Sequence, residues 1–342
     1  MTASDLDVLV AGGGPVGLAA AIECRRRGLT VAVVEPRDGP VDKACGEGLM
    51  PSAVAALGRL GVAVPGRPFV GIRYLRDGWS AQAAFRVGAG LGVRRTVLHA
   101  ALAERATRLG VEQVRGQVRD VEQSGTAVEA AGLRARWLLA ADGLHSPVRR
   151  ALGLVAESHE SPRYGLRRHF AVTPWTDHVE VHWSPRVEAY VTPVADDLVG
   201  VAVLGPRGVG YAEALADLPA LSSQLHGAEA ATAVLGAGPL RQRARAVRSG
   251  RVLLVGDAAG YVDALTGEGI AIGLGSARAA VAAVASGRPE DYPPAWDRQT
   301  RRYRLLTRSL LAVSSRPRPR AALVPVAARC PRTFARIVDL LA

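Results

Sequence analysis

The chain has 342 residues, of which 49% are hydrophobic, 22% are charged and 5% are aromatic, and it carries a formal net charge of +12. This length and apolar content allow a large buried core and about two domains. Nucleic-acid binding requires a clustered basic face with aromatic stacking partners, so the scarcity of aromatic residues argues against a nucleic-acid partner. The chain has a single lysine, Lys43, and no asparagine, a bias that indicates a GC-rich genome and accounts for much of the arginine excess.

The cysteines indicate the compartment. Cys24, Cys45 and Cys330 give an odd count, without a CxxC pair or a metal-type spacing. We therefore expect a cytoplasmic protein with reduced thiols and no bound metal. The N-terminal residues lack a basic leader and the chain has no long uncharged apolar run, so we expect neither a signal peptide nor a membrane span.

Residues 7–35 combine a strand, a glycine-rich turn, a helix and a second strand. Gly12 permits the tight turn, Gly14 leaves room for a pyrophosphate, and Gly17 permits close packing of the helix on the strand. The helix N-terminus offers free N–H groups to the phosphates. Glu35 ends the second strand, where its carboxylate can bind both hydroxyls of an unphosphorylated ribose. This segment predicts FAD or NAD as the bound dinucleotide, rather than NADP.

Two later segments carry turn and cap signals. Residues 74–85 read as a hairpin around the Asp-Gly dipeptide at 77–78, which suits a type I′ turn. Residues 137–140 read as a strand followed by a turn, and the next helix has Ser146 as its N-cap and Pro147 at its first position.

Residues 165–204 contain strand-like runs rich in valine, tyrosine, tryptophan and histidine. In one run, alternation places Val179, Val181 and Trp183 on one face and the two polar residues between them on the other. We expect an antiparallel sheet whose apolar face roofs a substrate pocket above the cofactor. The candidate polar groups of the pocket are His169, His178, His182 and Tyr190.

Residues 252–287 predict a second contact with the cofactor. A buried-type strand ends at Val255, and Asp257 follows at its carboxyl end, where ligands bind in open α/β sheets. Residues 266–269 then open a helix that runs to about Ser286 and ends at Gly287. N–H groups near its start suit the flavin pyrimidine edge, which becomes anionic on reduction. NAD has no group that needs this second site, so the segment favours FAD.

The C-terminal stretch, from about Pro294, reads as a basic helix with an apolar side. Such a helix can lie on an anionic membrane, but packing of the apolar side against the fold is the favoured interpretation. Residues 316–320 alternate arginine and proline and are expected to break the helix, and a short final helix is expected from Thr333 to Leu341.

Residues 7–35 and 252–287 together resemble the FAD-binding superfamily that includes para-hydroxybenzoate hydroxylase, the flavin halogenases and the geranylgeranyl reductases. The resemblance implies an α/β fold, in which a Rossmann-like FAD-binding domain of glutathione-reductase type carries an inserted antiparallel-sheet substrate domain and C-terminal helices. The FAD-binding domain then comprises residues 1–73, 94–160 and 246–290. The substrate domain comprises residues 74–93 and 161–245, and residues 291–342 form the helical segment.

Further matches to this superfamily imply individual roles. Residues 141–149, which include Asp142, match the Asp-Gly (DG) segment of the family. In hydroxylases this segment lies near the flavin and the path of the nicotinamide. Arg95 matches an arginine that opens a helix and reaches the cofactor. Val118, expected in a strand, matches a residue whose backbone contacts adenine. Residues 43–49 resemble the reductase branch, whose cysteine and glycines lie against the flavin, and Lys43 is expected near the cofactor phosphates.

These arguments predict two sets of binding residues. The predicted FAD-binding residues are Gly12, Gly14, Pro15, Val16, Gly17, Glu35, Lys43, Cys45, Gly46, Arg95, Val118, Asp142, Asp257, Gly267, Gly269 and Ile270. The predicted substrate-binding residues are Trp183 from the apolar face, and Tyr190 and Pro193, which match a tyrosine and a proline of the reductases and halogenases.

The resemblance favours a monooxygenase that uses NAD(P)H and O2 to hydroxylate an apolar small molecule, for which we expect an aromatic ring. A reductase of prenyl double bonds, of the geranylgeranyl type, is the alternative. Cys45 and Glu268 favour the reductase, because hydroxylases usually have a proline and paired glycines where this chain has residues 266–269. A third alternative is a binding protein of the Rab escort type that has lost the flavin, against which the intact Glu35, Asp142 and Asp257 argue.

Overall fold

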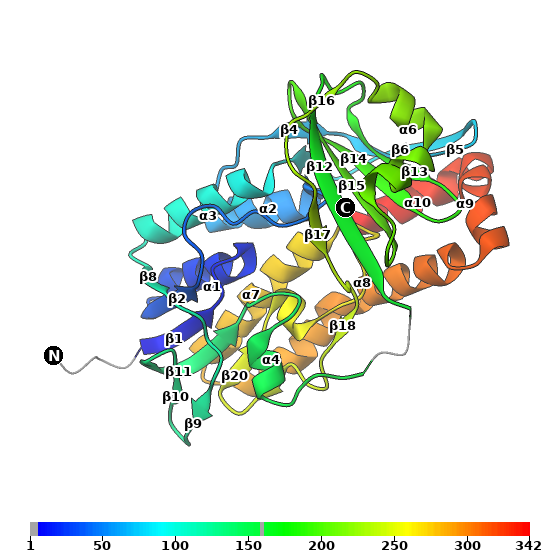
Figure 1. The fold of residues 1–342 in the computed structure, drawn as a ribbon. Coiled ribbons are helices and arrows are strands. Elements are labelled where there is room, and N and C mark those ends of the chain that lie inside the picture. The colour runs from blue at the N-terminus through cyan, green and yellow to red at the C-terminus, as the bar shows by residue number, and fades with distance from the viewer. Residues whose placement is uncertain (1–5, 158–160) are drawn as a thin grey trace.

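The computed structural model describes residues 6–157 and 161–342, in which two sheets are each covered by helices (Figure 1). The first sheet has eight strands, with the main order β19-β20-β11-β1-β2-β8. Its parallel strands are β1 (Leu6–Ala11), β2 (Val31–Glu35), β8 (Glu112–Arg115), β11 (Leu133–Ala140) and β20 (Val252–Leu254). Antiparallel strands β9 (Glu122–Gln123), β10 (Val128–Ala130) and β19 (Arg248–Ser249) complete it. We refer to it as the cofactor sheet.

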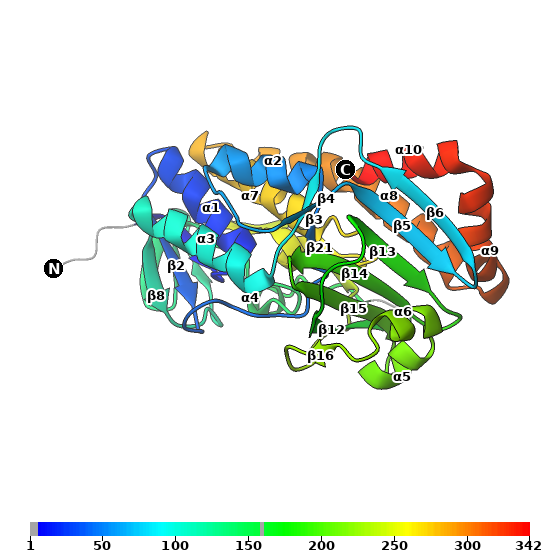
Figure 2. The ribbon, with the colours of Figure 1, turned by 90° about the horizontal axis from the view of Figure 1, so that it is seen from above.

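Helices cover the cofactor sheet because its central strands are apolar on both faces. They are α1 (Pro15–Arg26), α2 (Pro51–Leu60), α3 (Arg95–Arg108), α4 (Pro147–Ala151) and α7 (Gly269–Ala285). Helix α1 packs between α3 and α7, and Figure 2 shows these three together. The predicted end of α7 is confirmed, since Gly287 follows it in the left-handed conformation, with φ of 70°.

The second sheet, which we call the substrate sheet, also has eight strands, in the order β16-β12-β15-β14-β13-β5-β6, with β17 beside β12. They are β5 (Gly71–Arg76), β6 (Trp79–Ala84), β12 (Arg163–Ala171), β13 (His178–Trp183), β14 (Glu188–Ala195), β15 (Leu198–Pro206), β16 (Glu229–Ala230) and β17 (Leu235–Ala237). All its pairings are antiparallel except β5 with β13. Asp77 and Gly78 both have positive φ, which confirms the type I′ turn between β5 and β6.

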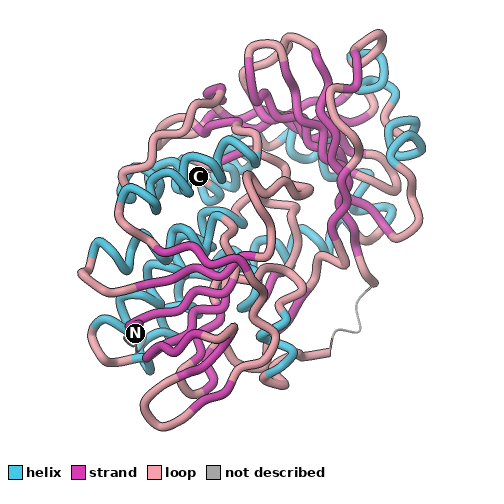
Figure 3. The backbone as a smooth tube through the Cα atoms, turned by 60° about the vertical axis from the view of Figure 1, so that its left-hand side comes forward, coloured by secondary structure: helices cyan, strands magenta, loops and turns pink. Residues whose placement is uncertain are grey.

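Both faces of the substrate sheet are buried, which differs from the expected single apolar face. The alternation along β13 is correct, with Val179, Val181 and Trp183 on one side. The intervening Glu180 and His182 are nevertheless buried too. Helices α5 (Tyr211–Ala216) and α6 (Pro219–Gln224) pack on the apolar residues of that second face. Figure 3 separates the strands of the two sheets, with helices beside both groups.

Three helices close the far side of the molecule: α8 (Tyr292–Ser314), α9 (Pro317–Arg329) and α10 (Pro331–Leu341). Their apolar sides pack against the substrate sheet. The helix does end before Arg316, but residues 317–320 were expected to lie in the break and instead begin a 13-residue helix that the sequence did not predict. Prolines are tolerated in the first turn, so Pro317 and Pro319 begin α9. Within residues 6–157 and 161–342, no helix combines the length and apolar character that a membrane crossing requires.

Short elements connect these parts. A three-stranded sheet contains β3 (Gly48–Leu49), β4 (Arg67–Phe69) and β7 (Gly90–Gly92), and a two-stranded sheet contains β18 (Gln242–Arg243) and β21 (Gly260–Tyr261). The 3₁₀ turns are Gly256–Ala259 and Pro289–Asp291. β5 begins at Gly71, inside the stretch that the sequence assigns to the FAD-binding domain. The remaining domain limits stay predictions.

Candidate functional site

The glycine-rich turn between β1 and α1 has the geometry expected of a phosphate-binding loop. Gly12 has φ of 98°, and a Cβ there would lie 2.6 Å from the carbonyl oxygen of Ala141. A Cβ on Gly17 would overlap the Gly12 carbonyl, so this glycine lets helix and strand touch. At Gly14 the only atom within 4 Å of a Cβ would be Arg95 Nη2, at 4.0 Å. The protein thus leaves space at Gly14, where the pyrophosphate is expected.

The start of α1 also carries Pro15 and Val16. Pro15 occupies the first helical turn, where its missing N–H costs nothing. Val16 is half-buried and packs against Gly256 and Gly273, because a Cβ on Gly256 would lie 3.0 Å from Val16 Cγ1. Val16 therefore packs the first cofactor segment, residues 7–35, against the second, residues 252–287.

Glu35 lies at the end of β2 beside the glycine loop. Its Oε2 accepts a hydrogen bond from Gly13 N at 2.8 Å, and its Oε1 accepts one from Arg37 Nε at 2.6 Å. Burial alone would raise the pKa of Glu35, but these hydrogen bonds hold the pKa below its usual value. The carboxylate is therefore ionised at neutral pH, as ribose binding requires, and that binding stays a prediction.

Cations converge on the same place. Burial lowers the pKa of Lys43, and the guanidinium groups of Arg37 and Arg95 lower it further. Glu35 and Asp257 act on Lys43 in the opposite direction. An excess of positive charge around the space left at Gly14 matches a bound pyrophosphate.

Two buried carboxyl groups lie near cations: Asp257 interacts with Lys43 and Arg95, and Asp142 interacts with Arg149. Asp142 Oδ2 accepts from Val148 N at 3.0 Å, whereas its buried Oδ1 has no partner among the described residues. Burial raises the pKa of both carboxyl groups. Ser146 caps α4 as predicted, by accepting from Arg149 N. The buried Arg149 donates to the carbonyl oxygens of Asp257 and Ala258, so it holds the DG segment against the second cofactor segment.

Residues 43–47 form a loop that leads into β3. Cys45 is half-buried, and its Sγ accepts from Glu47 N at 3.4 Å. The Gly46 carbonyl accepts from Thr192 Oγ1 of the substrate sheet at 2.7 Å. Glu47 is buried with φ of 58°, a strained conformation for a residue with a side chain. Sequence reasoning did not single out Glu47, because its partners lie 48 and 122 positions away.

The start of α7 has the backbone conformation and the exposure that contact with a flavin edge needs. Gly267 has φ of 70°, and Gly269 and Ile270 are half-buried. Glu268, between them, is buried, and its Oε2 has no hydrogen-bond partner among the described residues. Burial raises the pKa of Glu268 to about 7, and Arg302 offsets only part of that effect.

Val118 requires a correction. β8 ends at Arg115, so Val118 lies in the following loop and not in a strand. Gly116 directly follows β8, and Val118 is buried in the core of the cofactor domain from the loop beyond it. Contact of its backbone with adenine stays a prediction.

Trp183 and Tyr190 lie on one face of the substrate sheet, whereas Pro193, three residues after Tyr190 in β14, lies on the other face. Tyr190 donates to the carbonyl oxygen of Leu265, just before α7. Pro193 is buried at the end of β14 beside Gly92. Trp183 is 2% exposed and packs against Tyr74 and Arg320, so its ring belongs to the core between sheet and C-terminal helices.

The candidate histidines are each paired with a carboxylate. His169 Nε2 lies 2.6 Å from Glu47 Oε2, and His182 Nε2 lies 3.0 Å from Glu180 Oε2. His178, the first residue of β13, pairs with the preceding Asp177. Only His169 reaches a cofactor segment. The described residues contain no cluster of three or more side chains suited to hold a metal ion.

A cavity of about 430 Å³ adjoins the second cofactor segment. It lies between residues 241–248, residues 256–262, the start of α7 and α8, and Asp257, Tyr261 and Gly269 form part of its wall. Its arginines are Arg241, Arg243, Arg245, Arg248, Arg304 and Arg308. The cavity is therefore suited to an anion.

The residues present fit FAD. The space at Gly14, the surrounding cations and the unpartnered Oδ1 of Asp142 match the pyrophosphate and ribityl parts, and the start of α7 matches the flavin edge. When bound, FAD supplies the ability to accept a hydride and to pass on its electrons. The protein's part is to bind, orient and shield it.

Comparisons with known proteins agree with this assignment. A family described as FAD binding domain matches residues 95–288, more than half of the chain, and a second of the same description matches residues 7–56. The menaquinone reductase of Mycolicibacterium smegmatis is 32% identical to this chain, over 85% of this chain and 79% of that protein. The rifampicin monooxygenase of Streptomyces venezuelae is 34% identical, over 43% of this chain and 34% of that protein.

Solved structures share the fold. The p-nitrophenol 4-monooxygenase from Pseudomonas putida superposes with a TM-score of 0.80 at 21% identity, over 98% of both chains. This confirms the expected α/β architecture, with its parallel cofactor sheet and inserted substrate sheet. The chain therefore belongs to the FAD-dependent oxidoreductases built on the FAD binding domain, with FAD as its cofactor.

Proposed function

We propose that this FAD-dependent oxidoreductase reduces a carbon–carbon double bond in the prenyl part of an apolar substrate, with electrons from NAD(P)H. The observation that carries the proposal is the similarity to menaquinone reductase, which extends over 85% of the chain, whereas the similarity to rifampicin monooxygenase extends over 43%. The sequence alone favours hydroxylation, and these relatives reverse that order. Cys45 and Glu268, the residues that favoured the reductase in the sequence, support the same choice.

An apolar cluster beside the segment before α7 favours an apolar substrate. Met50, Val179, Val181 and Leu265 belong to this buried cluster, which spans the substrate sheet and the segment before α7. We expect the substrate to bind against it, because burial of a hydrocarbon chain against apolar side chains is favourable. Tyr190 supplies a polar group beside this cluster, and it is held in place by its bond to Leu265. We propose that the substrate is a small apolar molecule, not a nucleic acid, and that the protein acts in the cytoplasm.

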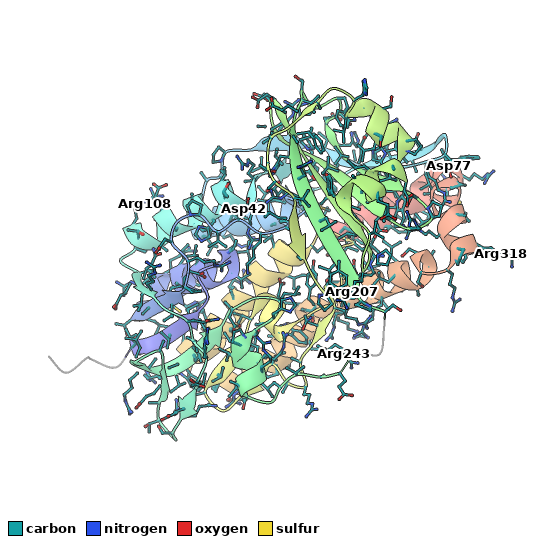
Figure 4. All side chains as sticks on the ribbon, viewed as in Figure 1. Asp42, Asp77, Arg108, Arg207, Arg243 and Arg318 are labelled. Carbon is teal, nitrogen blue, oxygen red and sulfur yellow. The ribbon has the colours of Figure 1, made fainter. Side chains whose placement is uncertain are left out.

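We propose that the phosphates of NAD(P)H bind in the arginine-lined cavity beside Asp257. Its wall reaches Gly269, at the start of α7, so a ligand there would lie next to the flavin site. Arg243→Ala should raise KM for NAD(P)H about tenfold, in the range that a charged hydrogen bond contributes. Arg318→Ala is the matched control, because Figure 4 shows Arg318 far from Arg243. Equal KM values in both variants would exclude this cavity.

The proposed reaction balances without oxygen. NAD(P)H gives a hydride, solvent gives a proton, and the substrate gains two hydrogens across its double bond while NAD(P)+ is released. The chain contributes orientation of the prenyl segment and exclusion of water, both of which preserve reducing equivalents for the substrate.

The second candidate function is hydroxylation with O2 and NAD(P)H, which inserts one oxygen atom and releases the other as water. The observation in its favour is the 34% identity to rifampicin monooxygenase over 165 residues. The relatives argue against the escort-type alternative, because those that match include a menaquinone reductase and a rifampicin monooxygenase.

The test is turnover with and without oxygen. Purified FAD-loaded protein is incubated with NADH or NADPH and with menaquinone as probe, under argon and in air, and products are weighed by mass spectrometry. The proposal expects a product two hydrogens heavier in both atmospheres, with the added mass in the prenyl fragment and still present after any quinol has been re-oxidised. A product one oxygen heavier, formed only in air, would establish the monooxygenase instead. The Gly14→Val variant, expected to lack FAD, is the control for uncatalysed chemistry.

A further inference from the structure

Strand β12 of the substrate sheet contacts two parts of the cofactor domain, the loop at residues 42–47 and the segment before α7, through one row of side chains. Arg163, Arg167 and His169 lie on the same face, because they are separated by even numbers of residues. Arg163 binds Asp263, in the segment before α7. Arg167 binds Asp42 and His169 binds Glu47, at the two ends of the loop that carries Lys43 and Cys45. Figure 4 labels Asp42 between the cofactor helices and the sheet.

The pair of His169 and Glu47 is fully buried and has a defined proton position. His169 is 0% exposed and Glu47 is 3% exposed. Arg167 Nη1, which can only donate, lies 3.0 Å from His169 Nδ1, so Nδ1 is the acceptor. The ring proton therefore resides on Nε2, which donates to Glu47 Oε2 at 2.6 Å. Arg167 thus fixes the tautomer that lets His169 hold Glu47.

Glu47 in turn makes hydrogen bonds to the backbone of residues 93 and 95 and to the thiol of Cys45. Its Oε1 accepts from Arg95 N at 2.8 Å, at the start of α3. Its own N–H donates to Cys45 Sγ, and its carbonyl accepts from Val93 N at 2.9 Å. The left-handed conformation of Glu47 is unfavourable for a residue with a side chain and persists only where neighbours determine it. A Cβ on Gly200 would lie 3.0 Å from Glu47 Oε2, so β15 has a glycine where this carboxylate passes.

We propose that Glu47 and His169 are positioning residues that set the Lys43–Gly46 loop, with the Cys45 thiol, against the bound flavin. The inference deepens the proposed function, since it names the residues through which the substrate sheet controls the surroundings of the flavin. Neither side chain is required to touch substrate. Their effect passes through the backbone of residues 45–47 and through the start of α3.

The same sheet provides a matched control. Glu180 and His182 form a second buried carboxylate–imidazole pair on the opposite face, 0% and 3% exposed, with a distance of 3.0 Å. Their other partners are Trp175 and Arg73, which belong to the substrate domain. Loss of this pair removes the same chemistry from the same sheet without touching a cofactor segment.

The experiment compares His169→Leu with His182→Leu in FAD-loaded protein. Cys330→Ser is included in all variants, because Cys330 is exposed, whereas Cys24 is buried and burial raises its pKa to about 12. Alkylation by iodoacetamide then reports on Cys45. We expect His169→Leu to change the rate of Cys45 alkylation about tenfold or more, since thiol reactivity follows access and surroundings. We also expect a shifted flavin absorption spectrum.

Flavin reduction gives a second readout. A displacement of about 1 Å can cost roughly 100-fold in rate, so His169→Leu should slow reduction by NAD(P)H about 10- to 100-fold at unchanged KM. His169→Gln should restore both readouts, because its amide can donate to Glu47. His182→Leu should change neither readout, although it should lower stability as much as His169→Leu does.

Equal changes in His169→Leu and His182→Leu, or none in either, would overturn the proposal. If His169→Leu does not fold, Glu47→Gln, which retains the size of the side chain, must show the same altered thiol and spectrum, or the proposal fails. The alkylation and absorption measurements need no substrate, so a wrong substrate or reaction leaves them unaffected. Failure of the proposed function is thereby distinguishable from failure of this inference.

Discussion

The two sheets place their charged residues differently. In the cofactor sheet the central strands are apolar on both faces, and the groups expected to bind FAD lie in loops at the strand ends. In the substrate sheet, buried ionisable side chains lie within the strands, including Arg167, His169 and Glu180. A parallel sheet covered by helices concentrates its function at one edge. The substrate sheet instead uses polar side chains within its strands to attach itself to other parts of the chain.

The attachment is clearest around Glu188, which is 0% exposed. Its carboxylate accepts from Arg163 and from Arg320 of α9, and Arg163 also binds Asp263. A buried carboxylate is costly unless its hydrogen bonds are satisfied, and here two guanidinium groups satisfy it. The cluster therefore joins the substrate sheet, the C-terminal helices and the segment before α7.

The largest expected effect tests the cofactor sheet. Gly14→Val should give a folded protein without FAD, since a side chain there meets open space in the protein but the pyrophosphate in the complex. The loss should exceed about 100-fold in affinity, or roughly 3 kcal/mol. Absorbance at 450 nm per protein after dialysis measures it.

Gly17→Val sharpens this first prediction. Its Cβ overlaps the Gly12 carbonyl, so this variant should unfold rather than lose only FAD. If Gly14→Val purifies yellow with full occupancy, the phosphate site lies elsewhere.

The second prediction concerns the substrate sheet. Trp183→Ala should lower the free energy of unfolding by about 3–5 kcal/mol, the range for removing a buried tryptophan, and should leave FAD affinity unchanged. Its ring fills the space beside Tyr74 and below Arg320. Urea unfolding measures the change, with Trp183→Phe as the milder control. A stable Trp183→Ala protein that fails only in turnover would restore the substrate role that the sequence predicted.

The sequence predicted the two regions to different extents, for a physical reason. The glycine loop and the type I′ turn are determined by residues within about 30 positions of one another, so their spacing shows the structure. The bond between His169 and Glu47 joins residues 122 positions apart, and neither residue type alone indicates its partner. Val118 was misplaced because valines recur past the end of β8, and α9 was missed because its prolines read as a helix break. Local motifs were therefore predictable, and the contacts between domains were not.

The third prediction concerns Glu268, at the boundary of the two regions. Its pKa is about 7 in the folded protein against 4.5 ordinarily, so between these values the folded state retains a proton that the unfolded state loses. FAD-free protein should therefore lose up to about 3 kcal/mol of stability as pH rises from 4.5 to 7. Glu268→Gln should match the wild type at pH 4.5 and exceed it at pH 8.

Urea unfolding at several pH values tests this prediction. Asp263 contributes in the same direction, because burial raises its pKa to about 6, but it is present in both proteins and cancels in the difference. Glu104→Gln, on the exposed side of α3, is the control. A parallel pH profile for Glu268→Gln and the wild type would place the titration elsewhere.

The smallest expected effect concerns Lys43, because much of its side chain is open to solvent and its charge is shared with neighbours. Partial loss of solvent around the ammonium group, together with the nearby Arg37 and Arg95, lowers its pKa, so in FAD-free protein Lys43 adds to an unfavourable excess of positive charge. Lys43→Ala should therefore leave the stability of the FAD-free protein unchanged or slightly raised. With FAD bound, the same change should weaken affinity by about 1 kcal/mol at low salt, and by less at high salt as screening increases. Titration of FAD at two salt concentrations measures this, and Gly14→Val shows the contrast, since its steric effect does not depend on salt. An equal loss for Lys43→Ala at both concentrations would mean that Lys43 acts through the shape of its loop and not through its charge.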